Sequence, residues 1–411
     1  MLPEILTTLN LPDDFWADLI PCSVSQLQEW RTGQRTVPYS VAERISKAIG
    51  IPASSVLATD AVTPVAIPAV WLKARDYELT VDVHRAIALT RLIASGYDEL
   101  GTLLARQTNE YSQLFYEIRK SVSPSDPPAR QGERAAAAFL SFTGLSHGAT
   151  GIGEALRPRL RSAGVLLLET PIDLRPLEGF CFSVAPGSRP CLIVNSYRST
   201  WFRRNAVLLH ELCHAIFDLD SAGAIFEVGP SEDVTSESED SRQSSEKRAE
   251  AFAMHALIPI RLLVAFENRG LKLQGLSADD MARLMSETHA ERSLIAKAAE
   301  HHGFVDSSER HRLERLEVAE PLKHYSTHAR NLYELSANQV YRLDILETSK
   351  RKTTFPIRGH RLPVQFVELV LEALQQGKIS LGKAAELLMM RKQDLEKRFG
   401  LAPQYESVSV A

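Results

Sequence analysis

Three residues within one short stretch have the types and the spacing of a metal site. Residues 208–218 read LLHELCHAIFD, with His210 and His214 four positions apart and Glu211 beside the first histidine. Residues four apart on an α-helix share a face, so the two imidazoles can bind one zinc ion at about 2.0–2.1 Å. The adjacent glutamate can then serve as a general base. The pattern predicts a zinc hydrolase, and the competing interpretation is a buried helix whose two histidines are structural.

A catalytic zinc needs a third protein ligand and keeps one position open. Further along the chain, Glu246 and Glu250 are spaced to share one helix face, and Asp218 lies four residues after His214. The spacing leaves all three open as candidate ligands. His255 falls on roughly the opposite face from Glu246, so we expect it to be a core or surface histidine.

The segments around the histidines predict a small sheet packed by helices. Three apolar, β-prone runs precede the histidine stretch, in the order AGVLLLETP, LEGFCFSVA and PCLIVNS. The last two are joined by PGSRP, so we expect them to form a hairpin. The segment 229–245 is acidic and serine-rich, which predicts a mobile loop that either covers the cleft as a lid or pseudosubstrate or has no role.

The two helical stretches together resemble the ImmA/IrrE family of zinc metallopeptidases. The chain has RRNAVLLHELCHAIFD followed by EKRAEAFAMHALIP, and the family has a second helix of the form Glu-x-x-Ala-Asn-x-Phe-Ala that ends in Leu-x-Pro. The matching residues here are Glu246, Ala249, Glu250, Phe252, Ala253, Leu257 and Pro259. The resemblance covers residues 130–270 and ranks Glu246 above Glu250 and Asp218 as the third ligand. Cys213 stands where the family usually has glycine, and Glu250 stands where it has asparagine.

This resemblance implies a narrow protease that cleaves one regulatory protein, typically a helix-turn-helix repressor, in stress or mobile-element control. The ligands would be His210, His214 and Glu246, with Glu211 as the base. A purely structural zinc site, with Glu250 or Asp218 as a fourth ligand, is a weaker alternative.

Residues 1–60 resemble an Xre/Cro-type helix-turn-helix domain. Its recognition helix would begin at about Ser25, which is a plausible N-cap, and end at about Thr32. The side chains expected to face DNA include Gln26, Gln28, Arg31 and Arg35, because glutamine and arginine can read base edges. This unit holds four basic and seven acidic side chains, so its attraction to phosphates is weak. Protein docking by the same fold is the alternative.

The composition is that of a soluble globular protein, with 44% hydrophobic and 24% charged residues. No apolar run approaches the roughly 20 residues that span a bilayer, and the acidic N-terminus does not resemble a signal peptide. These features predict a cytoplasmic protein without a membrane partner. The four cysteines are too few and too scattered for a disulfide framework; Cys181 and Cys191 flank the expected hairpin turn, and we expect them to be reduced thiols.

A chain of 411 residues predicts several domains, and the pattern predicts an α+β multidomain protein. The expected order is an all-α helix-turn-helix domain at 1–60, a helical connector at 71–120, the small-sheet metallopeptidase domain at 130–270, a helical region at 271–345 and an all-α, helix-turn-helix-like domain at 360–411. Linkers are expected at 58–70, 121–133 and 353–363.

The leading hypothesis is a zinc-dependent metalloendopeptidase fused to a DNA-binding domain. Its expected partners are a protein substrate, double-stranded DNA and a second copy of the chain. The alternative is a non-catalytic transcription regulator or antitoxin-like protein that uses the peptidase fold as a sensor or docking module.

Overall fold

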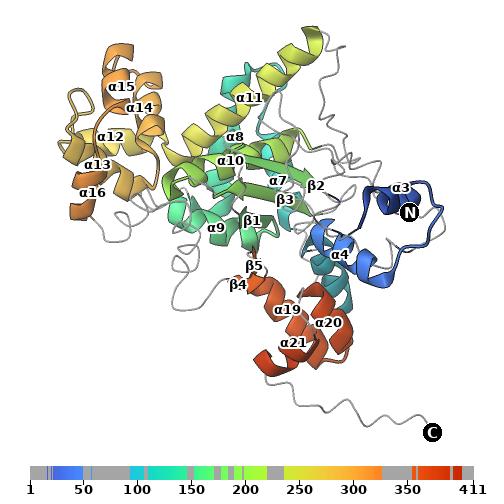
Figure 1. Ribbon diagram of the computed structural model, residues 1–411. Coiled ribbons are helices and arrows are strands. Elements are labelled where there is room, and N and C mark those ends of the chain that lie inside the picture. The colour runs from blue at the N-terminus through green and yellow to red at the C-terminus, as the bar shows by residue number, and fades with distance from the viewer. Residues whose placement is uncertain are drawn as a thin grey trace. The chain divides into compact units, whose positions relative to one another are not determined.

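The computed structural model divides the chain into two compact units (Figure 1). The first comprises Met1–Ile67, Leu79–Gln107 and Asp344–Ala411, and the second comprises Pro68–Glu78 and Thr108–Leu343. The structure describes residues 16, 20, 22–49, 57, 93–105, 110–145, 152–170, 177–183, 189–196, 199–219, 236–325, 354–357, 360–388 and 392–399. The domain limits expected from the sequence remain predictions.

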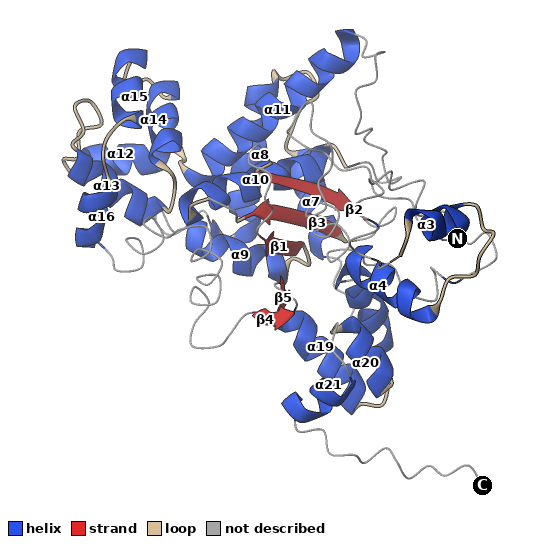
Figure 2. Ribbon diagram, in the orientation of Figure 1, coloured by secondary structure: helices blue, strands red, loops and turns tan. Residues whose placement is uncertain are grey.

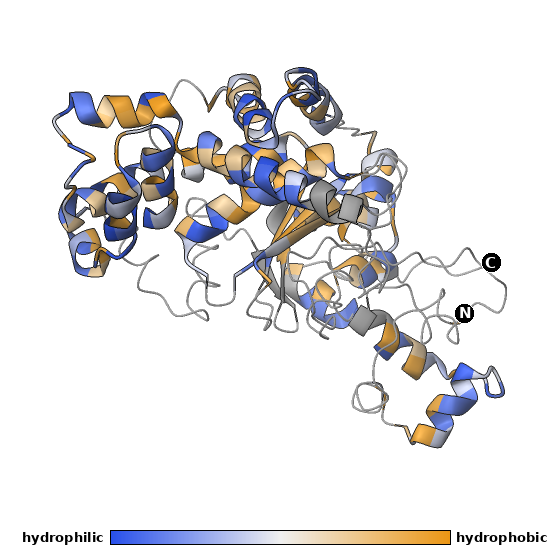
Figure 3. Ribbon diagram, turned by 90° about the horizontal axis from the view of Figure 1, so that it is seen from above, coloured by the Kyte–Doolittle hydropathy of each residue, from blue (hydrophilic) through white to orange (hydrophobic). Residues whose placement is uncertain are grey.

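A three-stranded sheet lies in the second unit (Figure 2). Its strands are β1 (Leu166–Thr170), β2 (Gly179–Ser183) and β3 (Pro190–Asn195), in the order β1-β3-β2. Strand β1 runs parallel to β3 and β2 runs antiparallel to it, which confirms the three predicted strands and the pairing of the last two. Every residue of β3 is buried, and the strands are coloured mostly as hydrophobic in Figure 3. The central strand is therefore enclosed by the rest of the unit.

The cysteines of the sheet do not face each other. Cys181 pairs in register with Leu192, and Cys191 pairs with Phe182. Both cysteines are buried and outside any disulfide, in agreement with the reduced thiols expected from the sequence.

Among the described residues, five helices pack on this sheet or on the helices that cover it. They are α7 (Glu110–Lys120), α8 (Pro128–Thr143), α9 (Ile152–Ser162), α10 (Trp201–Phe217) and α11 (Ser236–Leu257). Helix α10 packs on β2 and β3, and α11 packs along both α8 and α10. The small sheet with its helices agrees with the α+β fold expected of this region.

Two boundary predictions in this unit were wrong. Helix α8 begins at Pro128, inside the predicted linker 121–133, because proline fits the first turn of a helix, where its missing N–H is not needed. Helix α11 begins at Ser236, inside the predicted loop 229–245. Acidic residues favour the first turn of a helix, so the same composition that suggested a loop also suits a helix start. The part of that loop before Ser236 lies outside the described residues.

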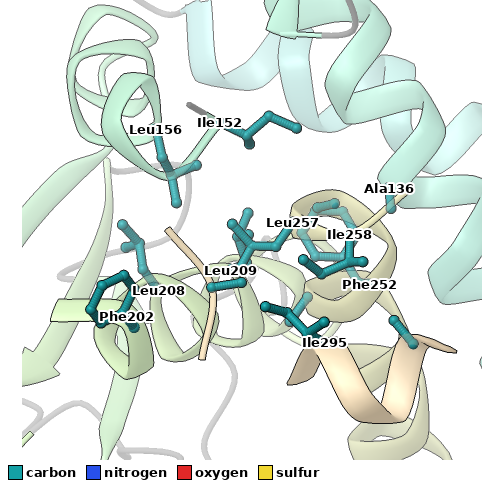
Figure 4. Close-up of a cluster of buried hydrophobic side chains, with 14 of the residues drawn as sticks. Ala136, Ile152, Leu156, Phe202, Leu208, Leu209, Phe252, Leu257, Ile258 and Ile295 are labelled. Carbon is teal, nitrogen blue, oxygen red and sulfur yellow. The ribbon is translucent and has the colours of Figure 1, made fainter. Parts of the chain in front are cut away.

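Five further helices continue the second unit, as predicted for the helical region that follows the peptidase domain. They are α12 (Ile260–Asn268), α13 (Ala278–Thr288), α14 (Arg292–His301), α15 (Ser307–Glu314) and α16 (Ala319–Tyr325). One continuous apolar core joins them to the sheet and to α10 and α11. Figure 4 shows Leu209 of α10, Phe252 of α11 and Ile295 of α14 within that cluster. The histidine helix is thus held from several sides.

The first unit contains α3 (Val24–Arg31), α4 (Tyr39–Ile49), a helix at 93–103, α19 (Val364–Gln375), α20 (Leu381–Leu387) and α21 (Lys392–Phe399). The N-cap of α3 is Ser23 and not Ser25, because Ser23 and Gln26 form a reciprocal capping box. The predicted linker at 353–363 was also wrong, since β4 (Thr354–Ile357) and β5 (His360–Pro363) pair antiparallel there. The region from 360 onward is therefore not purely helical. The linker predicted at 58–70 lies outside the described residues.

One helical stretch of the described chain, Gln243–Asn268, has the length and hydropathy of a membrane-spanning segment. In the structure, 61% of its most apolar window is buried inside the protein. It bends into two helices at Pro259 and contributes Phe252 and Phe266 to the core. This burial is typical of a core helix in a water-soluble protein.

Candidate metal centre

Helix α10 carries the two histidines into the interior of the second unit. The hydroxyl of Thr200 caps its first turn by accepting a hydrogen bond from the backbone N–H of Arg203. The relative exposure is 7% for His210, 3% for Glu211 and 2% for His214. These polar side chains are held in place by the apolar residues between them, which belong to the core.

Three ligand atoms converge beside α10. Nε2 of His210 and Nε2 of His214 are 3.0 Å apart. Glu246, from α11, places Oε2 at 3.3 Å from Nε2 of His210 and Oε1 at 3.5 Å from Nε2 of His214. All three donors lie within 4.8 Å of one another, which makes His210, His214 and Glu246 a group that could hold a metal ion. Two imidazoles and one carboxylate fit a zinc-type ion with one position left open.

Asp218 lies behind this group and contacts the other nitrogen of His214. Its Oδ2 is 2.7 Å from Nδ1 of His214, and its Oδ1 accepts hydrogen bonds from Ser245 at 3.0 Å and from Arg248. Asp218 closes α10, whereas Ser245 and Arg248 belong to α11. Because Asp218 is engaged with the far side of the ring, the structure places it as a partner of a candidate ligand.

The same contacts shift the pKa of the candidate ligands. Burial alone would lower the pKa of His214, but the hydrogen bonds to Asp218 and Glu246 outweigh it and raise the value to about 9. Burial would raise the pKa of Glu246, yet the hydrogen bonds and charges of His210 and His214 hold it well below the usual range. The site therefore concentrates negative charge around the two histidines, as a cation site requires.

A cleft with a volume of about 340 Å³ opens beside this group. Both His210 and Glu211 line it, so the candidate base and one candidate ligand face the same space. Strand β2 approaches closely at Gly179, where an added Cβ would lie 2.7 Å from Cγ1 of Val207 and 3.1 Å from Cγ of Glu211. Glycine at this position allows the edge strand to lie directly against the histidine helix.

Charged residues that the sequence analysis did not single out also line the cleft. Arg203 donates to Glu178 at 3.1 Å through Nε and to Glu291 at 3.2 Å through Nη1. Arg203 lies seven residues, about two helical turns, before His210, so the helix period could have placed it on the same face. Glu178 and Glu291 come from other elements, and no spacing in the sequence links them to the histidines.

The other candidate ligand, Glu250, is exposed and lines the cleft one turn from Glu246. Cys213 is fully buried, and burial raises the pKa of its thiol well above the usual range. A protonated, enclosed thiol is inert, as expected for a residue that only fills space.

The four candidate DNA-facing residues lie on or just after α3 in the first unit. Gln28 is exposed and Arg31 is half-buried. The side chain of Gln26 accepts a hydrogen bond from the backbone of Ser23, and Arg35 pairs with Glu29 at 3.2 Å. Gln26 and Arg35 therefore contact residues of the helix and its flank.

Comparison with known proteins gives one match. Residues 160–298 match the model of the peptidase M78 family, described as the IrrE N-terminal-like domain. The matched segment contains the sheet, α10 and all of α11, and hence all three candidate ligands. No curated protein and no solved structure matches the chain. The match supports an ImmA/IrrE-type peptidase domain in this part of the chain.

Proposed function

We propose that the second unit is a zinc-dependent metalloendopeptidase. The observation that carries this proposal is the convergence of His210, His214 and Glu246 beside a cleft that Glu211 also lines. The family match over residues 160–298 supports the same reaction class. A structural zinc would need a fourth protein ligand, and the group of described ligand atoms within 4.8 Å of one another has three members.

In this mechanism the chain's own residues orient the substrate and move the proton. A bound zinc ion would polarise the scissile carbonyl and lower the pKa of water in the site. Glu211 takes the proton of the attacking water and delivers it to the amine nitrogen that leaves. Asp218 would keep a proton of His214 on Nδ1, which leaves Nε2 as the nitrogen that would hold a bound ion. The apolar packing around α10 keeps this geometry rigid.

The experiment compares the wild-type protein with Glu211→Gln, both loaded with zinc. Each is incubated with a cell lysate, and newly formed protein N-termini are identified by mass spectrometry. We expect a small set of new N-termini with the wild type and none with Glu211→Gln, while zinc content is equal in both proteins. The same N-termini at the same rate with both proteins would contradict a role for Glu211 as the base.

We also propose that the first unit binds DNA, that the substrate is a regulatory protein, and that the chain acts in the cytoplasm together with a second copy of itself. The support is the well-capped helix α3, which carries Gln26, Gln28 and Arg31. Glutamine and arginine read base edges, so α3 has side chains suited to the major groove. A non-catalytic regulator that uses the peptidase fold as a docking module is the competing function.

Selection of DNA from a random pool by the full chain tests this second proposal. We expect an enriched sequence whose binding is lost with Arg31→Ala and kept with Gln113→Ala, an exposed glutamine on α7. Failure to enrich any sequence at low salt would count against DNA binding and would leave the peptidase proposal unaffected.

A further inference from the structure

Three histidines that take no part in the site above meet at the end of α14. His255 comes from α11, whereas His301 ends α14 and His302 follows it. The ring centres are 5.0 Å apart for His255 and His301, 5.2 Å for His255 and His302 and 5.0 Å for His301 and His302. Each pair is arranged edge to face. His255 is 6% exposed, so this cluster begins in the protein interior.

The ring nitrogens of this cluster have no hydrogen-bond partner among the residues that the structure describes. The Nε2 atom of His302 is buried and lacks such a partner. Buried polar atoms in folded proteins nearly always have a partner, and an apparent orphan is commonly explained by a water molecule or an ion. One such orphaned nitrogen, with two further imidazoles beside it, points to a shared ligand.

The spacing of the rings fits a single metal ion. At a metal–nitrogen distance of about 2.0–2.1 Å and tetrahedral angles, the ring centres of imidazoles on one ion lie about 5 Å apart. His210 and His214, the pair in the candidate metal centre, have ring centres 4.7 Å apart. The ring nitrogens of the cluster do not converge as closely as the ligand atoms of His210, His214 and Glu246, which lie within 4.8 Å of one another. A half-turn of an imidazole about its Cβ–Cγ bond exchanges ring nitrogens for ring carbons and leaves the ring centre in place. Such a turn would bring the nitrogens of the three rings toward one ion.

The protonation of the cluster suits a metal ligand. Burial lowers the pKa of His255 to about 4, although the charge of Glu133 opposes the shift, and the charges of His301 and His302 lower it further. The pKa of His302 is also lowered, mainly by burial and to a smaller extent by the charge of His301. Histidine binds metals in its neutral form, so the lowered pKa values of His255 and His302 favour the form that binds a metal. The carboxylate of Glu133, on α8, adds a nearby negative charge.

We propose that His255, His301 and His302 form a second metal site, selective for borderline divalent ions such as Zn²⁺, Co²⁺ or Ni²⁺. Imidazole ligands favour these ions over Mg²⁺ or Ca²⁺, which prefer oxygen. An ion at this site ties α14 to α11, the helix that carries Glu246. His301 also lines the cleft beside His210, so the second ion stands at the wall of that cleft.

The experiment isolates this site in the full-length chain by removing the first one. Metal-free His210→Ala/His214→Ala protein is titrated with Co²⁺, and the visible absorption of bound Co²⁺ is recorded together with the bound metal per chain. We expect one bound ion with the absorption of nitrogen-ligated Co²⁺. Adding His301→Ala and His302→Ala to this background abolishes that binding, whereas adding His311→Ala, a histidine on α15 outside the cluster, leaves it intact.

Two outcomes would overturn the second site: no Co²⁺ bound by the His210→Ala/His214→Ala protein, or binding that survives loss of both His301 and His302. Circular dichroism of each variant excludes unfolding as the cause, and His301 is exposed, so its loss is tolerated by the fold. The result is independent of the proposed peptidase. If only the first site failed, the wild type would bind one ion and His301→Ala/His302→Ala would bind none.

Discussion

Replacing Asp218 with asparagine tests how the structure holds a candidate metal ligand. The carboxylate accepts from Nδ1 of His214 with one oxygen, and from Ser245 and Arg248 with the other. Asparagine has one accepting oxygen and a donating NH₂ group, so it cannot accept on both sides. The substitution also removes the negative charge that pairs with Arg248. His214 then loses its orientation while the side-chain volume stays nearly constant.

The expected magnitude follows from the lost hydrogen bond. A hydrogen bond to a charged group contributes about 1.5–3 kcal/mol, and removing an outer partner of a metal-bound histidine typically costs about 10–100-fold in metal affinity. We expect Asp218→Asn to raise the Kd for Zn²⁺ at the first site by about 10–100-fold. Ser245→Ala removes one donor to the same carboxylate, and its expected effect is about fivefold, from a net contribution near 1 kcal/mol.

The assay is competition for Zn²⁺ against a chelator of known affinity, in the His301→Ala/His302→Ala background so that only the first site is measured. Asp126→Asn is the matched control, because the Asp126 carboxylate pairs with Arg134 at a distance of 2.7 Å and, among the described residues, contacts none of the candidate ligands. An unchanged Kd for Asp218→Asn, in a variant with native circular dichroism, would refute the role given to this carboxylate.

Three further results are expected. Zn²⁺ affinity measured by the same competition rises about tenfold per pH unit up to about pH 9. The reason is that His214, whose pKa is raised to about 9, must lose a proton to bind zinc at any lower pH. An affinity that is constant from pH 6.5 to 8.5 would contradict this. Gly179→Ala lowers the thermal unfolding midpoint by an amount equivalent to about 1–3 kcal/mol, since its Cβ would lie 2.7 Å from Val207, whereas Gly382→Ala, whose nearest neighbour is at 3.7 Å, does not. Phe252→Ala destabilises the second unit by about 3–5 kcal/mol in denaturant titration, and a cost below 1 kcal/mol would mean that this ring does not fill the core as described.

The sequence predicted the parts of this protein that local patterns control. The three β-prone runs became strands because a short apolar run and the turn residues that bound it are recognised within a few positions. The pairing of His210 with His214 follows from the helix period alone, and Glu246 follows from the resemblance of its helix to a known family. The structure brings these three residues together, while their roles in metal binding and catalysis remain proposals.

What the sequence did not predict depends on contacts between distant segments. Asp218 was weighed as a ligand, and only the packing of α10 against α11 shows that Ser245 and Arg248 hold it against His214. The cluster formed by His255 with the histidines of α14 was invisible for the same reason. Helix starts at Pro128 and Ser236 were missed because composition that suits a linker also suits a helix N-terminus.

The bound metal per chain tests the central claim most directly. The wild type and His210→Ala/His214→Ala are purified side by side without added metal or chelator, and the zinc per chain is measured by inductively coupled plasma mass spectrometry. The account predicts that the double variant carries one zinc ion fewer per chain than the wild type, whatever is bound elsewhere. Equal zinc in the two proteins, with both folded, would contradict a metal centre on α10 and the peptidase proposed from it.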